Sequence, residues 1–247
     1  MPTNSFATDL EILKEDSHLM VCRKPAGVPV QTAKFGQQDM TSLLKNYRAG
    51  KGEPPEIYVV HRLDQPVEGV MVFAKTQQAA ASLSRQIQQK NVDKYYYAVV
   101  EGVPKPCRGT LTDYLLRDGK TNTSKVAKKD TKGAKKAVLH YQIVEGGEIR
   151  SGEGREKTST LPETGKKGVS LLAIQLETGR HHQIRVQLAH AGHPLVGDKK
   201  YNPGCGEDYL PIGLCSTRLA FAHPTTGERL EFSIEPTGPA FHGFFMS

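Results

Sequence analysis

The strongest constraint on the fold of this chain is a succession of short apolar segments, rich in β-branched residues and separated by polar turns. Segments of this kind predict β-strands. They lie at residues 10–13, 19–24, 56–60, 69–75, 95–100, 109–116, 137–144, 169–176, 214–222 and 230–234. Three further segments, 41–48, 76–91 and 182–190, indicate helices, and we expect Thr41 to cap the first of them. The pattern predicts an α+β fold dominated by antiparallel strands.

The length and composition indicate one folded domain. The 247 residues can bury a sizeable core, so we expect a single domain over residues 1–247. Residues 145–167, rich in Gly, Ser, Thr, Glu and Lys, are expected to form a long loop inside this domain. No apolar run reaches the ~18 residues that cross a bilayer, and residues 1–16 lack the apolar core of a signal peptide. We therefore expect a cytoplasmic protein whose four widely spaced cysteines are free thiols.

Most of the net charge of the chain lies in one stretch. The net charge is +7, which favours a polyanionic partner without identifying it. Residues 117–136 contain eight Lys or Arg and two Asp. This stretch is either a solvated hairpin or an arm that faces phosphates, and its composition alone leaves both readings open.

Three functional side chains, His61, Arg62 and Asp64, lie together between two predicted strands. A carboxylate on a loop between rigid strands is well placed to react with a molecule that enters a cleft. The alternative is a local pair of Arg62 and Asp64 that stabilises a turn. These residues alone do not decide between the two.

A second group of functional side chains opens the predicted helix at 182–190. Arg180 and Arg185 provide fixed donors for carboxylate or phosphate, at a helix start that already favours anions. His181 and His182 are adjacent, and helix neighbours point about 100° apart, so we predict no metal site. In the strand at 95–100, Tyr96 points to the opposite face from its tyrosine neighbours and offers a stacking surface for a nucleobase if it is exposed.

Taken together, these segments resemble the RluA-type family of RNA pseudouridine synthases. The shared pattern runs in the same order through most of the chain. It comprises Leu10–Leu13, Lys24–Gly27, His61–Asp64, Gly69–Lys75, Lys94–Gly102, Thr178–Arg180, Gln183–Arg185 and Gly192–Asp198. Each segment is weakly specific, but a chance match of all of them in this order is negligible.

The resemblance implies a fold and an activity. The family fold is a bent, mixed, mainly antiparallel sheet with few helices and a central catalytic cleft. The implied reaction isomerises specific uridines of ribosomal or transfer RNA to pseudouridine, without metal or organic cofactor. We expect a monomer that binds RNA and no membrane. The pattern begins almost at Met1, so we expect no N-terminal S4 RNA-binding domain.

The resemblance also implies roles for single residues. Asp64 aligns with the catalytic carboxylate, Tyr96 with the tyrosine that stacks on the target base, and Arg185 with the arginine that pairs with the carboxylate. Arg62 matches the arginine that fills the place of the flipped nucleotide. Further expected contacts to substrate come from His61, Arg180 and Ile184, and expected contacts to the RNA backbone from Lys128, Lys129 and Lys132.

The chain departs from the family pattern at two places beside the implied active site. Val67 and Glu68 stand where the family has Thr-Ser, and His181 stands where a Thr commonly follows the Gly-Arg pair. We expect a basic partner, Arg62 or Lys75, to hold Glu68, the alternative being a glutamate that points into solvent.

Two other functions compete with an isomerase. A hydrolase of nucleosidic or glycosidic bonds usually needs two carboxylates in fixed roles, and Asp64 is the one carboxylate in a persuasive loop. A non-catalytic RNA-binding protein explains the basic stretch but gives Asp64 no purpose. Release of free base distinguishes a hydrolase from an isomerase, because isomerisation leaves the RNA mass unchanged.

Overall fold

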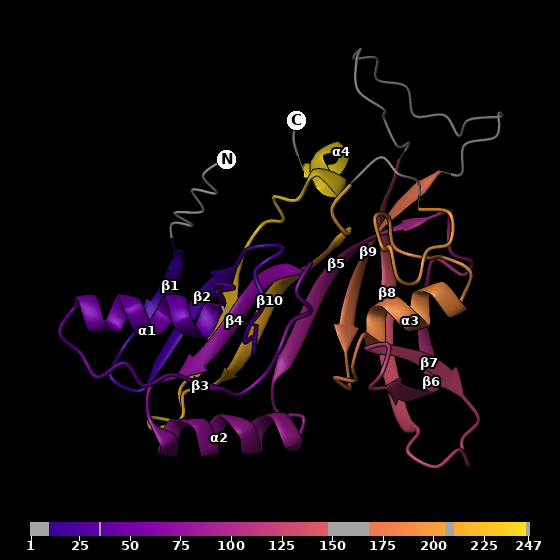
Figure 1. Cartoon of the computed structure of the whole chain (residues 1–247). Coiled ribbons are helices and arrows are strands. Elements are labelled where there is room, and N and C mark those ends of the chain that lie inside the picture. Colours follow the sequence, from indigo (N-terminus) through magenta and orange to yellow (C-terminus); the bar gives the residue numbers. More distant parts are fainter. Residues whose placement is uncertain (1–9, 35, 148–167, 206–209, 246–247) are drawn as a thin grey trace. The chain divides into compact units, whose positions relative to one another are not determined.

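Residues 10–34, 36–147, 168–205 and 210–245 are described by the computed structural model (Figure 1). The chain divides into unit 1, residues 1–92 and 219–234, and unit 2, residues 93–218 and 235–247. The division falls inside strand β10 (Leu214–Ala222), after Arg218. The single domain expected over residues 1–247 stays a prediction.

Unit 1 is built around strand β4 (Glu68–Ala74), of which every residue is buried. β4 pairs antiparallel with β2 (Leu19–Lys24), which pairs antiparallel with β1 (Ile12–Glu15). The two-residue strand β3 (Tyr58–Val59) also pairs with β4. Helices α1 (Met40–Gly50) and α2 (Gln77–Gln88), strand β11 (Arg229–Ser233) and the end of β10 complete the unit.

The core of unit 1 lies on one face of β4. Val70 and Val72 alternate with residues that point to the other face, because successive side chains in a strand point in opposite directions. They pack with Leu19 of β2, Leu83 of α2 and Phe221 of β10, which are all buried. Burial of each such side chain contributes roughly 1.5–3 kcal/mol, so this face fixes the strands on either side of the loop that precedes β4.

Unit 2 contains five strands in the order β5–β9–β8–β6–β7, each antiparallel to its neighbour. They span Asp93–Glu101 (β5), Arg108–Asp118 (β6), Thr123–Ala127 (β7), Lys135–Gly147 (β8) and Val169–Leu176 (β9). Helix α3 (Gln183–His190) lies beside the β6–β7 hairpin (Figure 1). A short 3-10 turn, Pro239–Phe241, leads into helix α4 (His242–Phe245).

The α+β class with mainly antiparallel strands is confirmed, and most elements lie within three residues of their expected positions. The predicted cap of α1 is wrong: Asp39 caps the helix, and its side chain forms a reciprocal capping box with Ser42. Helix α2 ends before residue 91, because Lys90 adopts a left-handed φ of 60°.

The strands around the basic stretch differ from expectation in two ways. Strand β7 has no counterpart among the predicted segments. β8 extends to Gly147 and so takes the first three residues of the expected 145–167 loop, while residues 148–167 of that loop lie outside the described residues. Within the described part of the chain, no helix is long and apolar enough to span a membrane.

Candidate active site

Asp64 lies on the loop between β3 and β4, and this loop is anchored through its neighbour Gln65. The Gln65 carbonyl accepts a hydrogen bond from the Gly27 amide at 2.9 Å, and the Gln65 side-chain amide donates to the Gly27 carbonyl at 3.0 Å. The Val67 amide closes a turn on the Asp64 carbonyl at 3.0 Å. Leu63 is buried, whereas Asp64 is half-buried. The arrangement fixes the backbone around Asp64.

Lys24 holds the same loop through hydrogen bonds from its ammonium group. It is among the largest fully buried side chains in the described structure, and its ammonium donates to the backbone carbonyls of Pro25, Val28 and Gln65 at 2.8, 2.6 and 3.0 Å. Burial lowers the pKa of Lys24 from 10.5 to about 7, while the charges of Asp64 and Glu68 act in the opposite direction. The sequence pattern placed Lys24 in a loop motif but gave no sign of this role, because lysines are rarely buried.

The other residues of this loop differ in how they are held. Arg62 is exposed and donates to the Gln31 side chain at 3.2 Å, so it is available to a molecule outside the protein. His61 instead accepts a hydrogen bond from the Val72 amide at 3.1 Å through Nε2, which ties it to β4. The predicted substrate role of His61 stays a prediction, and the structure adds this backbone contact to it.

A basic partner of Glu68 is confirmed, but the expected identity of that partner is wrong. Its carboxylate lies 3.5 Å from Arg23, whereas Lys75 pairs with Glu15 and Glu53, and Arg62 contacts Gln31. Glu68 is only 5% exposed, so the reading of a solvent-pointing glutamate is also wrong. The reason is its position as the first residue of β4, a strand that is buried on both faces.

In unit 2, Tyr96 lies on β5 opposite Ile174 of β9 and is 7% exposed. Its neighbours face the other way, as expected. The Arg218 guanidinium lies 3.8 Å from the centroid of the Tyr95 ring, and Tyr97 packs on Phe245 with ring centroids 5.3 Å apart. The aromatic strand is therefore confirmed, whereas the Tyr96 ring is buried rather than exposed, and its stacking role stays a prediction.

Arg185 lies on α3 and forms a buried, bidentate ion pair with Asp198. Its Nε and one terminal nitrogen donate to the two carboxylate oxygens at 2.8 and 2.7 Å. Such a pair holds the planar guanidinium in one orientation. Asp198 was part of the family pattern but had no predicted role. It lies 13 residues from Arg185 along the chain, and a contact over that separation cannot be read from a motif. The predicted pairing of Arg185 with Asp64 stays a prediction, because the two residues belong to different units.

The remaining predicted residues of unit 2 divide into buried and exposed ones. Ile184 is buried in α3, which is consistent with packing as well as with a substrate contact. Arg180 is exposed and donates to the Lys136 carbonyl at 2.9 Å. Every lysine and arginine of residues 117–136 is exposed, including Lys128, Lys129 and Lys132.

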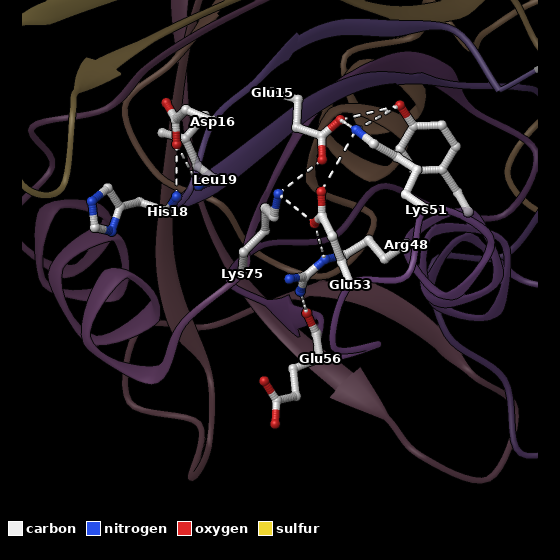
Figure 2. A network of polar contacts seen from close by, with 10 residues as sticks. Glu15, Asp16, His18, Leu19, Arg48, Lys51, Glu53, Glu56 and Lys75 are labelled. Atoms are coloured by element: carbon white, nitrogen blue, oxygen red, sulfur yellow. Dashed lines mark hydrogen bonds and ion pairs between the residues drawn. The ribbon is translucent and has the colours of Figure 1, made fainter.

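A network of ion pairs that was not predicted lies elsewhere in unit 1 (Figure 2). Lys75 is almost fully buried and bonds to Glu15 at 2.8 Å and to Glu53 at 3.0 Å, and Arg48 bonds to Glu53 at 3.2 Å. These residues line an open hollow together with Lys51. Because the charges compensate one another, we read the network as a link between β1, α1 and β4 rather than as a reaction site.

Comparisons with known proteins place these residues in a family. The family model for RNA pseudouridylate synthase matches residues 18–190, a span that contains Lys24, Asp64, Tyr96 and Arg185. Of the solved structures, the human RNA pseudouridylate synthase domain containing 4 matches 94% of this chain and 92% of its own length, with a TM-score of 0.71 and 24% identity, which supports the fold.

Several curated relatives are similar along most of this chain. An uncharacterized RNA pseudouridine synthase of Bacillus subtilis strain 168, YhcT, is 33% identical over 89% of the chain, which spans 66% of that relative. A tRNA pseudouridine synthase C of Yersinia pestis is 31% identical over 90% of the chain and 84% of the relative. A ribosomal large subunit pseudouridine synthase D of Zymomonas mobilis is 32% identical over 92% and 69%. On the family model and these relatives, the chain belongs to the RNA pseudouridine synthases of the RluA type.

Proposed function

We propose that this protein isomerises specific uridines in ribosomal or transfer RNA to pseudouridine, with Asp64 as the catalytic carboxylate. The observation that carries the proposal is the anchored loop of Asp64, which lies inside the matched residues 18–190 and is fixed by Lys24 and Gly27. The names of the relatives from Yersinia pestis and Zymomonas mobilis support transfer RNA and the large ribosomal RNA as the substrate classes.

The reaction needs few protein groups. The N1–C1′ bond of uridine breaks, the uracil turns, and a C5–C1′ bond forms; C5 then loses its proton and N1 gains one, without any change in oxidation state. An ionised Asp64 assists the exchange of bonds. The positive form of Lys24 lies near this carboxylate and stabilises its negative charge. The carboxylate is held by a backbone that does not have to reorganise during the reaction.

Access to the target uridine requires that the base leaves its stack. Extrusion of a base costs a few kcal/mol in unstacking. In our proposal Arg62, which is exposed, occupies the space left by the base, and Tyr96 stacks on the uracil. We further propose that Arg185, whose orientation Asp198 fixes, is the arginine that pairs with the catalytic carboxylate, and that His61, Arg180 and Ile184 contact the substrate.

The exposed lysines of residues 117–136 provide the sequence-independent part of RNA binding. Lysine ammonium groups act as point charges that suit phosphates rather than base edges. Their exposure in and around the β6–β7 hairpin leaves them accessible to phosphates, and the membership of the chain in a family of RNA-modifying enzymes supports the phosphate-facing arm over the solvated hairpin. Lys128, Lys129 and Lys132 are the residues that we expect to contact the RNA backbone.

The substitution Asp64→Asn tests the proposal. RNA labelled with tritium at uridine C5 loses the label to water when the C5 proton leaves, so the wild-type protein should release tritium and the variant should release none. The variant should keep the wild-type circular dichroism spectrum and RNA affinity, because Asn preserves the shape of the side chain. Tritium release at the wild-type rate by the variant would exclude Asp64. Free uracil in the wild-type reaction would instead indicate a hydrolase, and RNA binding without tritium release by the wild type would indicate a non-catalytic RNA-binding protein.

A further inference from the structure

The hairpin of β6 and β7, the basic hairpin, carries the exposed side chains of Arg117, Lys120 and Lys125 around its turn. It is attached to the residues before α3 through His181. Its Nδ1 lies 2.9 Å from the Ser124 hydroxyl on β7, and its Nε2 lies 3.2 Å from the side-chain oxygen of Asn122 in the hairpin turn. A neutral imidazole donates through one nitrogen and accepts through the other. The Asn122 oxygen only accepts and the Ser124 hydroxyl can donate, so both contacts are satisfied when Nε2 carries the proton. His181 is thus matched to two separate points of the hairpin.

His182 continues this attachment toward the interior. Its ring stacks on His181 with centroids 3.7 Å apart, and its Nδ1 lies 2.6 Å from the Tyr201 hydroxyl. The same hydroxyl accepts the backbone N–H of Ser124 at 2.8 Å. His182 has a left-handed φ of 53°, which is unfavourable for a residue with a Cβ atom. A residue persists in such a conformation where its surroundings hold it, and here the stacked ring and Tyr201 do so.

Tyr201 connects the two histidines to the predicted catalytic arginine. The Arg185 guanidinium lies 5.1 Å from the centroid of the Tyr201 ring. The Tyr201 amide donates to Asp198, the carboxylate that also holds Arg185. A continuous series of contacts therefore runs from the basic hairpin, through both histidines and Tyr201, to Arg185.

We propose that His181 and His182 are positioning residues that hold the basic hairpin against the start of α3, so that its lysines meet the RNA in one arrangement. The inference rests on the proposed function, because it requires the hairpin to bind RNA phosphates. A fixed hairpin loses less conformational freedom when RNA binds. A detached hairpin is competent for only part of the time, and the apparent affinity falls by that fraction. A Thr at position 181, as in the family pattern, has a single hydroxyl in place of the two ring nitrogens and cannot reproduce both contacts.

The experiment uses His181→Thr together with Asn122→Gly. The glycine removes the side-chain oxygen that His181 contacts but tolerates the left-handed backbone of the turn, where Asn122 has a φ of 50°. Each variant is assayed for tritium release from total RNA labelled at uridine C5 and prepared from cells that lack this protein. We expect the apparent KM to rise by about 3–10-fold and kcat to stay within about twofold, since the competent fraction of the hairpin falls while the reacting groups are unchanged.

A second background separates positioning from a merely structural role. In a protein that carries Lys120→Gln and Lys125→Gln, the two lysines of the hairpin, His181→Thr should raise KM by less than in the wild type, because the lysines through which it acts are gone. Equal effects of His181→Thr in both backgrounds, or no effect in the wild type, would overturn the inference. If the double lysine substitution itself leaves KM unchanged, the proposed role of the basic hairpin fails instead, while Asp64→Asn still reports on the isomerase activity separately. Faster hydrogen exchange of the Ser124 amide in His181→Thr would show the detachment directly.

Discussion

Lys24 is completely buried, and its ammonium group donates to three backbone carbonyls around the loop of Asp64. A lysine in this position has two opposed effects. Its hydrogen bonds order the loop, while removal of its charge from water favours the neutral form. The balance, a pKa of about 7, means that Lys24 changes its charge close to neutral pH.

This lowered pKa predicts a pH dependence of stability. The pKa of Lys24 is about 7 in the folded chain against 10.5 for an ordinary lysine, so between these values the unfolded chain binds more protons. The free energy of unfolding that Lys24 contributes should therefore rise with pH in this window, by about 1.4 kcal/mol per pH unit at most, and should be lowest below pH 7. The substitution Lys24→Met removes this titration.

Urea denaturation of the wild type and of Lys24→Met at about pH 6.5 and about pH 9 checks this expectation. The free energy of unfolding of the wild type minus that of Lys24→Met should increase by more than about 1 kcal/mol from the lower to the higher pH. A difference that is the same at both pH values would contradict it. The comparison with Met cancels the titration of all other groups to first order.

At the scale of residues, the sequence indicated which side chains are reactive but not which contacts fix their positions. Asp64, Tyr96 and Arg185 stand in motifs that a single chain can be searched for. Lys24 and Asp198 act through burial and through contacts that the fold creates, and neither burial nor a partner 13 residues away is visible in a motif. The error on Glu68 has the same origin, because its environment follows from the register of β4 on β2.

At the scale of elements, the ion pairs around Lys75 join β1, the segment that follows α1 and the residue that follows β4 (Figure 2). Burial alone would raise the pKa of the Glu15 carboxyl, but hydrogen bonds from Lys75 and Lys51 hold it below its ordinary value. Hydrogen bonds from Lys75 and Arg48 likewise lower the pKa of Glu53. Both carboxylates therefore stabilise the folded chain at neutral pH, and this contribution is lost as the pH falls through their folded-state pKa values.

We predict that Glu15→Gln lowers the free energy of unfolding near neutral pH by about 1–3 kcal/mol, because the nearly buried Lys75 then keeps only Glu53 as a charged partner. The variant should also lose less stability than the wild type when the pH is lowered to about 4. The matched control is Glu11→Gln, since Glu11 is half exposed and lies 3.5 Å from Arg23. The control should change stability by less than about 0.5 kcal/mol. Equal effects of both substitutions would show that the network around Lys75 is no more than a surface feature.

Element positions were predictable where apolar side chains mark them. The strands at 19–24, 169–176 and 214–222 agree with β2, β9 and β10 because each is a buried apolar run. Strand β7 has little apolar character and pairs with β6 at the end of the strand order, so its formation depends on its partner rather than on its own sequence. The cap of α1 was misplaced because Asp39 and Thr41 are both suitable capping residues, and the hydrogen bond to the Ser42 amide selects Asp39.

At the scale of the whole molecule, the charge is distributed unequally between the two units. Unit 1 contains 12 Lys or Arg and 11 Asp or Glu, whereas unit 2 contains 21 and 15. Nearly all of the net charge of +7 therefore belongs to unit 2, which also contains the basic hairpin. This distribution could be read from the sequence, but its division between two units and the exposure of each lysine required the structure.

The unequal distribution predicts that the salt dependence of RNA binding arises from unit 2. Each lysine that neutralises a phosphate releases a counterion, so removal of one lysine should reduce the slope of log K against log salt by about 0.7–0.9. The combined change Lys128→Gln, Lys129→Gln and Lys132→Gln should thus reduce the slope by about 2.

As a charge-matched control, Lys14, Lys34 and Lys45 are exposed lysines of unit 1, and their change to Gln removes the same net charge. Filter-binding titrations of one RNA at several salt concentrations give the four slopes that are needed, including those of the wild type and of a protein with all six changes. A long-range effect of net charge would reduce the slope equally in both triple variants, whereas phosphate contacts by the three lysines between β7 and β8 predict a reduction in the unit 2 variant and almost none in the control. The protein with all six changes should then have the same slope as the unit 2 variant, because only contacts that release counterions contribute to the slope.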